Sequence, residues 1–205
     1  PGPALFLDRD GTIVEEVGYL HRAGDVRLIE GAAAVIAAAN AQAIPVIVVT
    51  NQAGIGRGLF DWADLVAVEA HIEMELAARG ARLDAVLASP FHSEGRPPYR
   101  DPDHPGRKPN PGMLLRAAAL FAIDLEISWI IGDRASDIAA GRAAGLAGGI
   151  HVATGWGCAP GERESALSCA KAGDHDGGYE VLTAGSILDA ARTLPFLAKS
   201  AATTS

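Results

Sequence analysis

The sequence predicts an α/β protein with a doubly wound, mainly parallel sheet and helices on both faces. Short apolar, β-branched runs alternate with longer segments of helical periodicity, which is the pattern of parallel strands joined by helices. The runs are almost continuously apolar, as expected of strands buried on both faces. The composition, 49% hydrophobic but only 5% aromatic, also suits helices packed on a parallel sheet.

The first half of the chain supplies three expected strands and two expected helices. The strands are expected at residues 4–7, 44–49 and 83–88, and the helices at 31–43 and from an N-cap at Asp61 to about residue 76. Residues 18–25 are polar and punctuated by glycine, which predicts a loop. Gly54, Gly56 and Gly58 around Arg57 predict a flexible turn after the second strand.

The second half opens with a long loop, about residues 89–107, rich in Pro, Gly, His and charge. Loops of this length are usually functional or disordered, so it is a candidate specificity element. A helix then begins near Pro111. The remaining elements are expected as strands at 127–131 and 150–152, helices at 138–144 and 186–197, and a polar, glycine-rich segment at 155–178. Gly145 is suited to end the first of these helices.

Charge, cysteine content and hydropathy exclude several classes of protein. The net charge of −8 argues against a nucleic-acid partner, because affinity for the phosphate backbone comes from Lys and Arg. Cys158 and Cys169 form no CxxC motif, so neither a disulfide framework nor a cysteine zinc site is indicated. No apolar run reaches the length of a membrane helix and no signal segment opens the chain, which predicts a cytoplasmic protein without membrane contact.

Polar and charged residues follow the predicted strands in a set order. They are Asp8 and Asp10, then Thr50 and Asn51, then Lys108 at a helix start, then Asp133 and Asp137. The carboxyl ends of strands in a doubly wound sheet converge on one crevice. Carboxylates, a hydroxyl and an ammonium can hold a phosphoryl group, neutralise its charge and transfer it. From the first acidic stretch alone, an acidic turn is an equal alternative; the order of all four groups favours the site.

The four motifs DxDGT, a strand-end Thr, a Lys and GDxxxD resemble those of the haloacid dehalogenase (HAD) superfamily of phosphohydrolases. The stretches FLDRDGTI, GYLH, VVTNQAGIGRG, RKPNPGML and GDRASDIAAGRAAG are similar to the branch of heptose bisphosphate and histidinol phosphatases, over roughly residues 4–195. This resemblance implies a Rossmann-like α/β fold with a minimal cap made only of a loop insertion, and dependence on Mg²⁺.

Carried over by position, the resemblance makes Asp8 the nucleophile and a Mg²⁺ ligand. Asp10 becomes the acid and base, and gives its backbone carbonyl to the metal. Thr50 and Asn51 hold phosphoryl oxygens, and Lys108 offsets the charge of phosphate and Asp8. The remaining assignments are Asp133 as a metal ligand, Asp137 in the outer metal shell, and Gly11 and Arg107 as substrate-binding residues, with Arg57 and His21 as further candidates.

The long loop departs from the pattern of this branch, whose members commonly bind zinc there through a CxH and a CxC pair. The corresponding residues are 89–91 and 104–106, which contain no cysteine. A structural zinc site needs about four N or S ligands, so zinc is not expected. His92 and His104 keep open a histidine-based site as the alternative to ordinary surface histidines.

The resulting prediction is a single phosphatase domain over residues 1–205, monomeric or weakly homo-oligomeric, that hydrolyses a small phosphorylated metabolite. A heptose bisphosphate is preferred because GYLH and GIGRG are closer to the heptose enzymes, and histidinol phosphate is the alternative substrate. A different class is a non-catalytic phospho-acceptor domain, against which Asp10 argues, since a stable acyl phosphate needs no acid two residues on. A nucleic-acid end phosphatase is disfavoured by the net charge.

Overall fold

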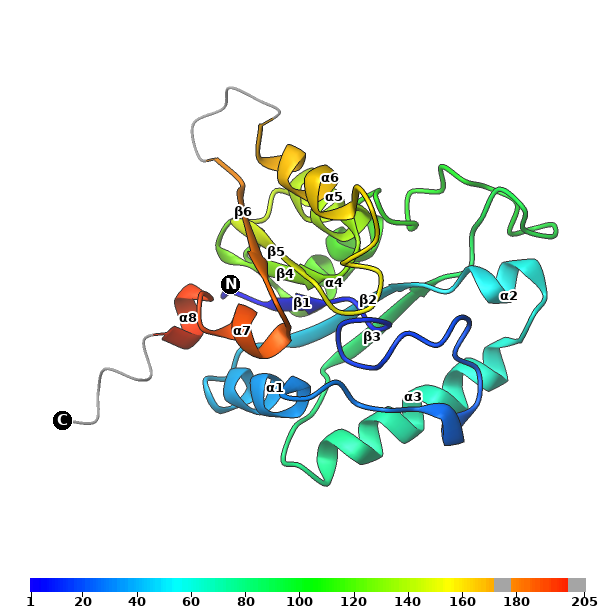
Figure 1. Ribbon diagram of the computed structural model, residues 1–205, viewed down its shortest axis with the longest axis horizontal. Coiled ribbons are helices and arrows are strands. Elements are labelled where there is room, and N and C mark those ends of the chain that lie inside the picture. Colours follow the sequence, from blue (N-terminus) through cyan, green and yellow to red (C-terminus); the bar gives the residue numbers. More distant parts are fainter. Residues whose placement is uncertain (172–177, 199–205) are drawn as a thin grey trace.

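The described part of the chain is built on a six-stranded sheet in which all neighbouring strands are parallel (Figure 1). This computed structural model describes residues 1–171 and 178–198. The strands are β1 (Leu5–Leu7), β2 (Val46–Asn51), β3 (Ala85–Ser89), β4 (Trp129–Gly132), β5 (Gly148–Val152) and β6 (Glu180–Ala184), in the spatial order β3-β2-β1-β4-β5-β6. The direction of winding changes between β1 and β4, where a doubly wound sheet places its ligand crevice.

Helices cover both faces of this sheet (Figure 1). They are α1 (Ala32–Ala41), α2 (Ala53–Arg57), α3 (Trp62–Ala77), α4 (Gly112–Phe121), α5 (Ala135–Ala144), α6 (Glu162–Ser168), α7 (Ile187–Ala191) and α8 (Pro195–Ala198), with short 3-10 turns at Ala23–Asp25, Leu125–Ile127 and Cys169–Lys171. In Figure 1, α1 and α3 lie on one side of the sheet, and α4, α5 and α6 on the other. The predicted fold class is confirmed.

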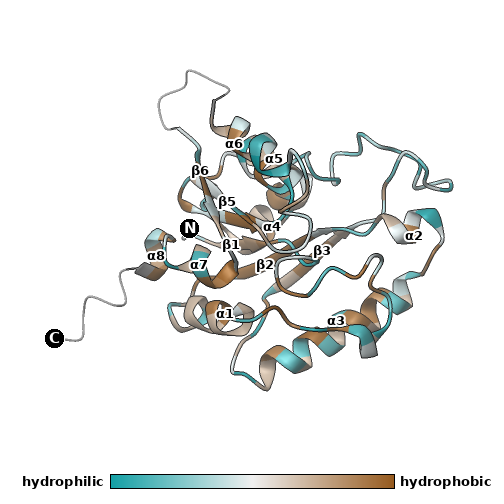
Figure 2. Cartoon of the chain, viewed as in Figure 1, coloured by the Kyte–Doolittle hydropathy of each residue, from teal (hydrophilic) through white to brown (hydrophobic). Residues whose placement is uncertain are grey.

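Alternate residues of the central strands supply the two halves of the core. Leu5 and Leu7 of β1 belong to the cluster that packs under α1 and α3, whereas Phe6 between them belongs to the cluster under α4 and α5. This alternation follows from the period of two in a strand. The strands are therefore apolar on both faces, which Figure 2 shows as brown β1 and β2 at the centre of the fold.

Helix ends follow the sequence signals where those signals are local. Asp61 caps α3: its carboxylate accepts hydrogen bonds from the backbone N–H groups of Ala63 and Asp64. Gly145 ends α5 in the left-handed region, with φ 82°. Both boundaries were predicted from these residue types.

Several local predictions were wrong. The glycine-rich stretch expected to be a flexible turn forms helix α2 and ends at Gly58, φ 73°. Helix α6 lies within the segment at 155–178, for which only a polar, glycine-rich character was given, and β6 was not predicted. The last predicted helix is two short ones, α7 and α8. Residues 172–177 of that polar segment, and 199–205 of the predicted domain, lie outside the described residues. None of the described helices combines the length and the apolar character needed to cross a membrane.

Candidate functional site

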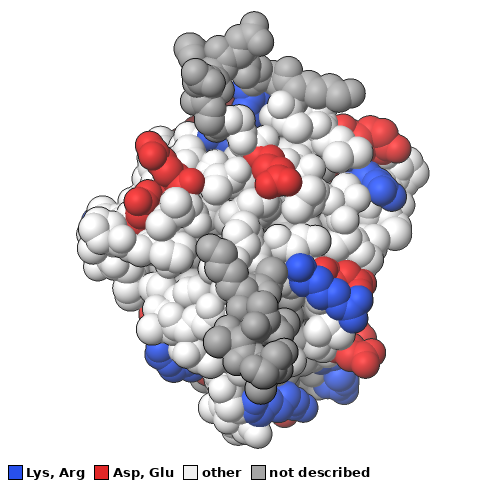
Figure 3. Space-filling model, turned by 90° about the vertical axis from the view of Figure 1, so that its left-hand side faces the viewer, with Lys and Arg blue, Asp and Glu red and all other residues white. Residues whose placement is uncertain are grey.

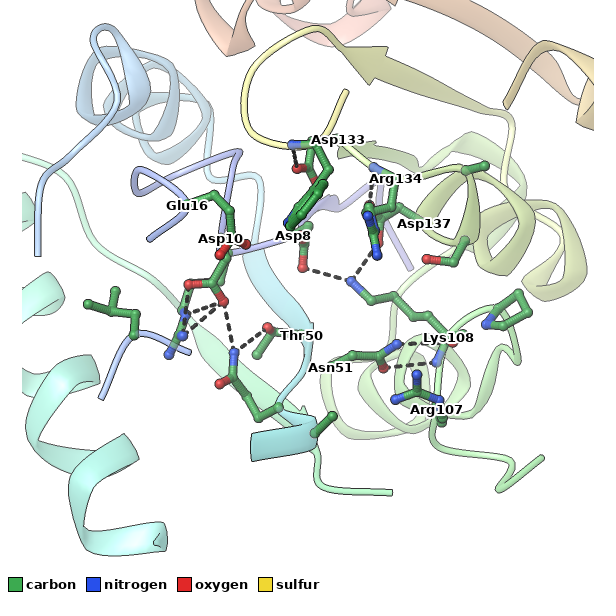
Figure 4. Close-up of a pocket in the computed structure, with 18 of the residues that line it drawn as sticks. Asp8, Asp10, Glu16, Thr50, Asn51, Arg107, Lys108, Asp133, Arg134 and Asp137 are labelled. Atoms are coloured by element: carbon green, nitrogen blue, oxygen red, sulfur yellow. Dashed lines mark hydrogen bonds and ion pairs between the residues drawn. The ribbon is translucent and has the colours of Figure 1, made fainter. Parts of the chain in front are cut away.

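Polar side chains from three neighbouring strands meet at the carboxyl end of the sheet. Strand β1 pairs in parallel with β2 on one side and with β4 on the other, so the three strands end at the same edge. Asp8 directly follows β1, Thr50 lies near the end of β2, and Asp133 directly follows β4. All three line a cavity of about 550 Å³ (Figure 4).

Most of the predicted site residues line this cavity. They are Asp8, Asp10, Thr50, Asn51, Arg107, Lys108, Asp133 and Asp137. Gly11, His21 and Arg57 are not among the lining residues. The sequence order of motifs therefore identified the centre of the site, and it was less informative about the periphery.

A buried ammonium group holds the centre together. Lys108 Nζ lies 2.8 Å from Asp8 Oδ1 and 2.6 Å from Asp137 Oδ1, and it also donates a hydrogen bond of 2.6 Å to the carbonyl of Val49. Figure 4 shows the Lys108 side chain reaching between the two carboxylates. The Lys108 ammonium thereby joins Asp8, which follows β1, with Val49 of β2 and Asp137 of α5.

Asn51 holds the backbone of Lys108. Its Nδ2 donates to the Lys108 carbonyl at 3.0 Å, and its Oδ1 accepts from the Lys108 N–H at 3.1 Å. Both ends of the amide are thus engaged with one peptide segment. This contact gives Asn51 a positioning task beside the phosphoryl-binding role expected of it, which stays a prediction.

Burial and mutual repulsion change the acidity of these groups. Burial raises the pKa of Asp8 to about 7 against the attraction of Lys108. Burial, together with the neighbouring Asp8 and Asp137, raises the pKa of Asp133 to about 8. Burial alone would lower the pKa of Lys108, but Asp137 and Asp8 outweigh burial and raise it. Lys108 therefore stays charged. The raised pKa values of Asp8 and Asp133 indicate that a second positive charge near these carboxyl groups would stabilise their ionised form.

A divalent cation fits this carboxylate group. Asp8, Asp133 and Asp137 each offer an oxygen, and these atoms lie within 4.8 Å of one another. Asp133 Oδ2 accepts a hydrogen bond from the Trp156 N–H at 2.7 Å, whereas its Oδ1 is buried and has no hydrogen-bond partner among the described residues. Carboxylate oxygens in such a group suit a hard cation such as Mg²⁺.

Gly11 allows the first and fourth motifs to pack closely. Its φ is 81°, and a Cβ added to it would lie 2.2 Å from Asp133 Oδ2. The Thr154 hydroxyl also donates to the Gly11 carbonyl at 2.5 Å. The structure thus gives this residue a packing role next to Asp133; the expected contact with substrate stays a prediction.

Asp10 belongs to a second network, which the sequence did not reveal. Its carboxylate accepts two hydrogen bonds from Arg9, at 3.0 and 2.9 Å, and one from Gln52 Nε2 at 2.9 Å. Gln52 also donates to the Thr50 hydroxyl at 2.9 Å. Arg9 is fully buried and is paired on its other side with Glu69 of α3 at 2.8 Å. In Figure 4, Asp10 lies on the opposite side of Asp8 from Lys108.

The signals for this network differ in strength. Arg9 stands between two acids in the sequence, so a pairing with one of them could have been anticipated from spacing. Gln52 directly follows the second motif. Glu69 is a single acid on the long helix α3, and only the tertiary structure brings it to Arg9.

The outer wall includes residues that the sequence analysis did not assign. Arg134 lies over the Trp156 ring, with its Cζ 5.2 Å from the ring centroid, and both line the cavity together with Glu16 and Tyr19. Arg134 could have been considered because it stands inside the fourth motif. Nothing near Trp156 in the sequence marks it as part of a site.

His21 and Arg57 are not among the residues that line the cavity, but they contact residues near its outer wall. The His21 ring stacks on Phe60 with 5.8 Å between centroids. Arg57 forms an ion pair of 3.1 Å with Glu94 and lies 5.6 Å from the centroid of the Tyr19 ring. These contacts hold the loop that carries Tyr19, and a direct contact of either residue with substrate stays a prediction.

Arg107 follows the long loop and lines the cavity. Its guanidinium Nη1 donates a hydrogen bond of 2.7 Å to the Phe91 carbonyl. His92 also lines the cavity. Partial burial lowers the pKa of Arg107, which leaves it fully charged because the ordinary value is so high.

Comparison with known proteins finds relatives that are named as phosphatases. The HAD-hydrolase-like family matches residues 106–171. A D-glycero-beta-D-manno-heptose-1,7-bisphosphate 7-phosphatase from Mesorhizobium japonicum is 48% identical over 150 residues, which are 73% of this chain and 69% of the relative. The enzyme of that name from Pasteurella multocida is 37% identical over 152 residues, which are 74% of this chain and 82% of the relative.

Solved structures agree with these relatives. A crystal structure described as a HAD-like phosphatase from Mesorhizobium loti superposes with a TM-score of 0.77 and 40% identity, covering 96% of this chain and 84% of the other. The D,D-heptose 1,7-bisphosphate phosphatase from B. bronchiseptica, complexed with magnesium and phosphate, gives a TM-score of 0.75 and 28% identity, covering 94% and 97%.

The close packing of Gly11 on Asp133 predicts a large penalty for a methyl group there. Gly11→Ala should lose about 1–2 kcal/mol through its positive φ and a further ~1–3 kcal/mol through the clash. Gly18→Ala is the matched control, because Gly18 has φ 68° but nothing within 4 Å of an added Cβ. Denaturant unfolding of both variants measures the difference, and equal losses would contradict the packing role.

Proposed function

Since this chain belongs to the HAD-like phosphatases, we propose that it removes one phosphate from a sugar bisphosphate of the heptose 1,7-bisphosphate class, with Mg²⁺ as cofactor. The observation that carries the proposal is the buried Lys108 between Asp8 and Asp137, in a cavity that Arg107 also lines. The relatives named as heptose bisphosphate phosphatases support the substrate class. The phosphatase activity itself follows from the family.

Asp8 is the proposed nucleophile. Lys108 holds its Oδ1 at 2.8 Å, and Oδ2 attacks phosphorus while the bond from phosphorus to the sugar oxygen breaks. The product of this step is an aspartyl phosphate on Asp8 and a free alcohol. Lys108 and the Thr50 hydroxyl offset the charge that the phosphoryl oxygens carry. Water then attacks the aspartyl phosphate, which releases inorganic phosphate and restores the carboxylate.

Asp10 is the proposed proton carrier. It gives a proton to the departing sugar oxygen and later takes one from the attacking water, so its protonation state is restored after each cycle. Arg9 and Gln52 hold its carboxylate through three hydrogen bonds. A group that must meet two different oxygens in turn benefits from a fixed position.

The proposed Mg²⁺ ligands are the side chains of Asp8 and Asp133 and the backbone carbonyl of Asp10. Asp137 is assigned to the outer shell, because one of its oxygens pairs with Lys108 and the other accepts the Arg134 N–H at 2.9 Å. When bound, the cation supplies positive charge against the phosphoryl oxygens. The unpartnered oxygen of Asp133 supports this arrangement.

Substrate choice is assigned to groups outside the transfer site. Every phosphate ester presents the same phosphoryl group to Asp8 and Lys108, so these residues cannot distinguish leaving groups. Arg107 offers a planar fork suited to a second phosphate. Histidinol phosphate, the alternative substrate, has no second phosphate for this residue to bind.

Further expectations concern the class of protein, its partners, its location and its oligomeric state. The acid-base residue Asp10, with its dedicated support, argues against a non-catalytic phospho-acceptor domain. Acidic and basic side chains are interspersed on the face drawn in Figure 3, and the chain carries a net charge of −8, which does not favour nucleic acid. The cytoplasmic location, the single domain, the absence of structural zinc and the monomeric or weakly oligomeric state stay predictions.

Asp8→Asn should abolish turnover of heptose 1,7-bisphosphate in the presence of Mg²⁺, by about 10³-fold or more, because the amide cannot form the acyl phosphate. The fold should survive, since the amide oxygen can still accept the Lys108 hydrogen bond. Phosphate release and circular dichroism measure the two effects. A folded Asp8→Asn protein with near wild-type rates would refute the nucleophile assignment.

Asp10→Asn should lose most on substrates with poor leaving groups. A sugar alkoxide needs a proton to depart, whereas the anion of an activated aryl phosphate such as p-nitrophenyl phosphate leaves with little help. The ratio of kcat on the sugar phosphate to kcat on the aryl phosphate should therefore fall well below that of the wild type. Equal losses on both would reduce Asp10 to a structural residue.

Stabilisation by Mg²⁺ should grow with pH. The pKa values of Asp8 and Asp133 are raised, to about 7 and about 8, so the metal-free folded state binds extra protons. The stability that these protons contribute is complete below the ordinary carboxyl pKa and is lost as pH rises through 7 to 8. Mg²⁺ competes with those protons.

Unfolding is best compared with excess Mg²⁺ and with chelator at about pH 6 and about pH 8.5. The gain from Mg²⁺ should be larger at the higher pH by about 1 kcal/mol or more. Because the same pH applies to both arms, titration of other groups cancels. Asp133→Asn should remove most of the gain, and a gain independent of pH would contradict the placement of the metal.

Arg107→Ala should weaken kcat/KM for heptose 1,7-bisphosphate by ~1.5–3 kcal/mol, as for a lost hydrogen bond to a charged group. Heptose 7-phosphate, which presents the same scissile ester without the second phosphate, should lose much less. The selectivity between the two substrates should therefore collapse. A uniform loss on both would move Arg107 into the shared phosphoryl site.

A further inference from the structure

Three aromatic rings gather in the loop that precedes Arg107. Figure 1 shows this segment between β3 and α4 extending past the sheet beside α2. The Phe91 and His104 rings stack with 3.4 Å between centroids and 8° between planes, and Tyr99 meets Phe91 edge-on at 5.7 Å. Such a cluster is unusual in a chain with only 5% aromatic residues.

The cluster is tied to the body of the protein. Trp62, at the start of α3, donates from Nε1 to the Tyr99 hydroxyl at 3.2 Å. The Arg96 N–H donates to the carbonyl of Gly56 in α2 at 2.7 Å. The loop therefore has a ring core of its own and two anchors on helices, and its two ends, around Phe91 and His104, are brought face to face.

His104 uses its ring nitrogen inside the loop. The Gly106 N–H donates to His104 Nδ1 at 3.0 Å, so this nitrogen is an acceptor and the ring is held in one orientation. The His104 carbonyl accepts the Arg107 N–H at 2.8 Å. The turn from His104 to Arg107 is thus set by the same residue that stacks on Phe91.

Arg107 is bound at both ends by the stacked pair. Its backbone N–H is held by the His104 carbonyl, and its guanidinium by the Phe91 carbonyl at 2.7 Å. The structure shows two links between the ends of the loop, the ring stack and this guanidinium contact. If the stack were lost, the Phe91 carbonyl could move away and release the guanidinium.

We propose that the Phe91 and His104 ring stack positions the Arg107 guanidinium at the cavity entrance and so determines selectivity for a substrate with a second anionic group. This proposal rests on the function proposed above, in which Arg107 contacts that group. Phe91 and His104 act through Arg107 and are positioning residues. An aromatic pair in a well-formed stack stabilises its arrangement modestly, which predicts a graded effect.

Two substitutions of His104 separate the ring from the hydrogen bond. His104→Asn keeps a side-chain acceptor for the Gly106 N–H but removes the ring. His104→Phe keeps a stacking ring but removes the acceptor. Asp103→Ala is the control for a substitution next to His104 that removes no contact, because Asp103 is exposed and its carboxylate forms none of the hydrogen bonds found in the described chain.

The measurement is the ratio of kcat/KM for heptose 1,7-bisphosphate to that for heptose 7-phosphate. His104→Asn should lower this ratio by about twofold to tenfold, with the monophosphate little changed, whereas His104→Phe and Asp103→Ala should keep it. In an Arg107→Ala background His104→Asn should have no further effect. A ratio retained in His104→Asn, or lost equally in His104→Phe, would overturn the proposal.

A spectroscopic readout separates this proposal from the choice of substrate. A guanidinium held by the Phe91 carbonyl should show restricted rotation in ¹⁵N nuclear magnetic resonance, assigned by its loss in Arg107→Ala. The restriction should persist in His104→Phe and disappear in His104→Asn. If wild-type protein hydrolyses neither sugar phosphate, the substrate proposal has failed and this readout still decides the positioning role. Restricted rotation in His104→Asn would overturn it.

Discussion

The ammonium of Lys108, buried between Asp8 and Asp137, is the interaction on which the rest of the site depends. Parallel strands that end at one edge bring carboxylates together out of water, which is costly unless a cation compensates. Lys108 supplies one such charge. Its own burial is stable only because two carboxylates and a carbonyl surround the ammonium. Removing one partner of a buried pair typically costs about 3–5 kcal/mol, so the three groups depend on one another.

Lys108 alone does not neutralise all the carboxylates at this edge of the sheet. The other carboxylates have separate surroundings. Asp10 is separated from Lys108 by Asp8 and receives its positive charge from Arg9, which Glu69 shares. Within the described residues, Asp133 forms no ion pair with either cation, and its Oδ1 has no hydrogen-bond partner. The two acids of the first motif, two residues apart in sequence, therefore lie in different electrostatic surroundings, Asp8 beside Lys108 and Asp10 beside Arg9.

How far the sequence predicted this arrangement depends on the range of the signal. Apolar runs, the Asp61 cap and Gly145 are local, and they located most strands and helix ends. The glycines around Arg57 suggested a turn, yet they form α2, where an added Cβ on Gly54 or Gly56 would meet Phe60 or the Pro90 carbonyl. Both glycines are therefore explained by close packing, with the nearby Phe60 and with the distant Pro90, and the local glycine pattern does not record such contacts. The pairing of Arg9 with Glu69, sixty positions apart, is hidden for the same reason.

The long loop obtains its shape from aromatic packing, although its sequence offers no cysteine with which zinc could fasten it. Without that metal site, the sequence left open whether the loop could have a definite shape. Stacked rings at Phe91 and His104 join its two ends, and the join lies at the residues whose carbonyls hold Arg107. In the proposed function, the charge network at the sheet edge binds the phosphoryl group that all substrates share, whereas the loop contacts the part in which they differ. On that proposal, selectivity can change by repacking the Phe91 and His104 rings, without disturbing the carboxylates that pair with Lys108.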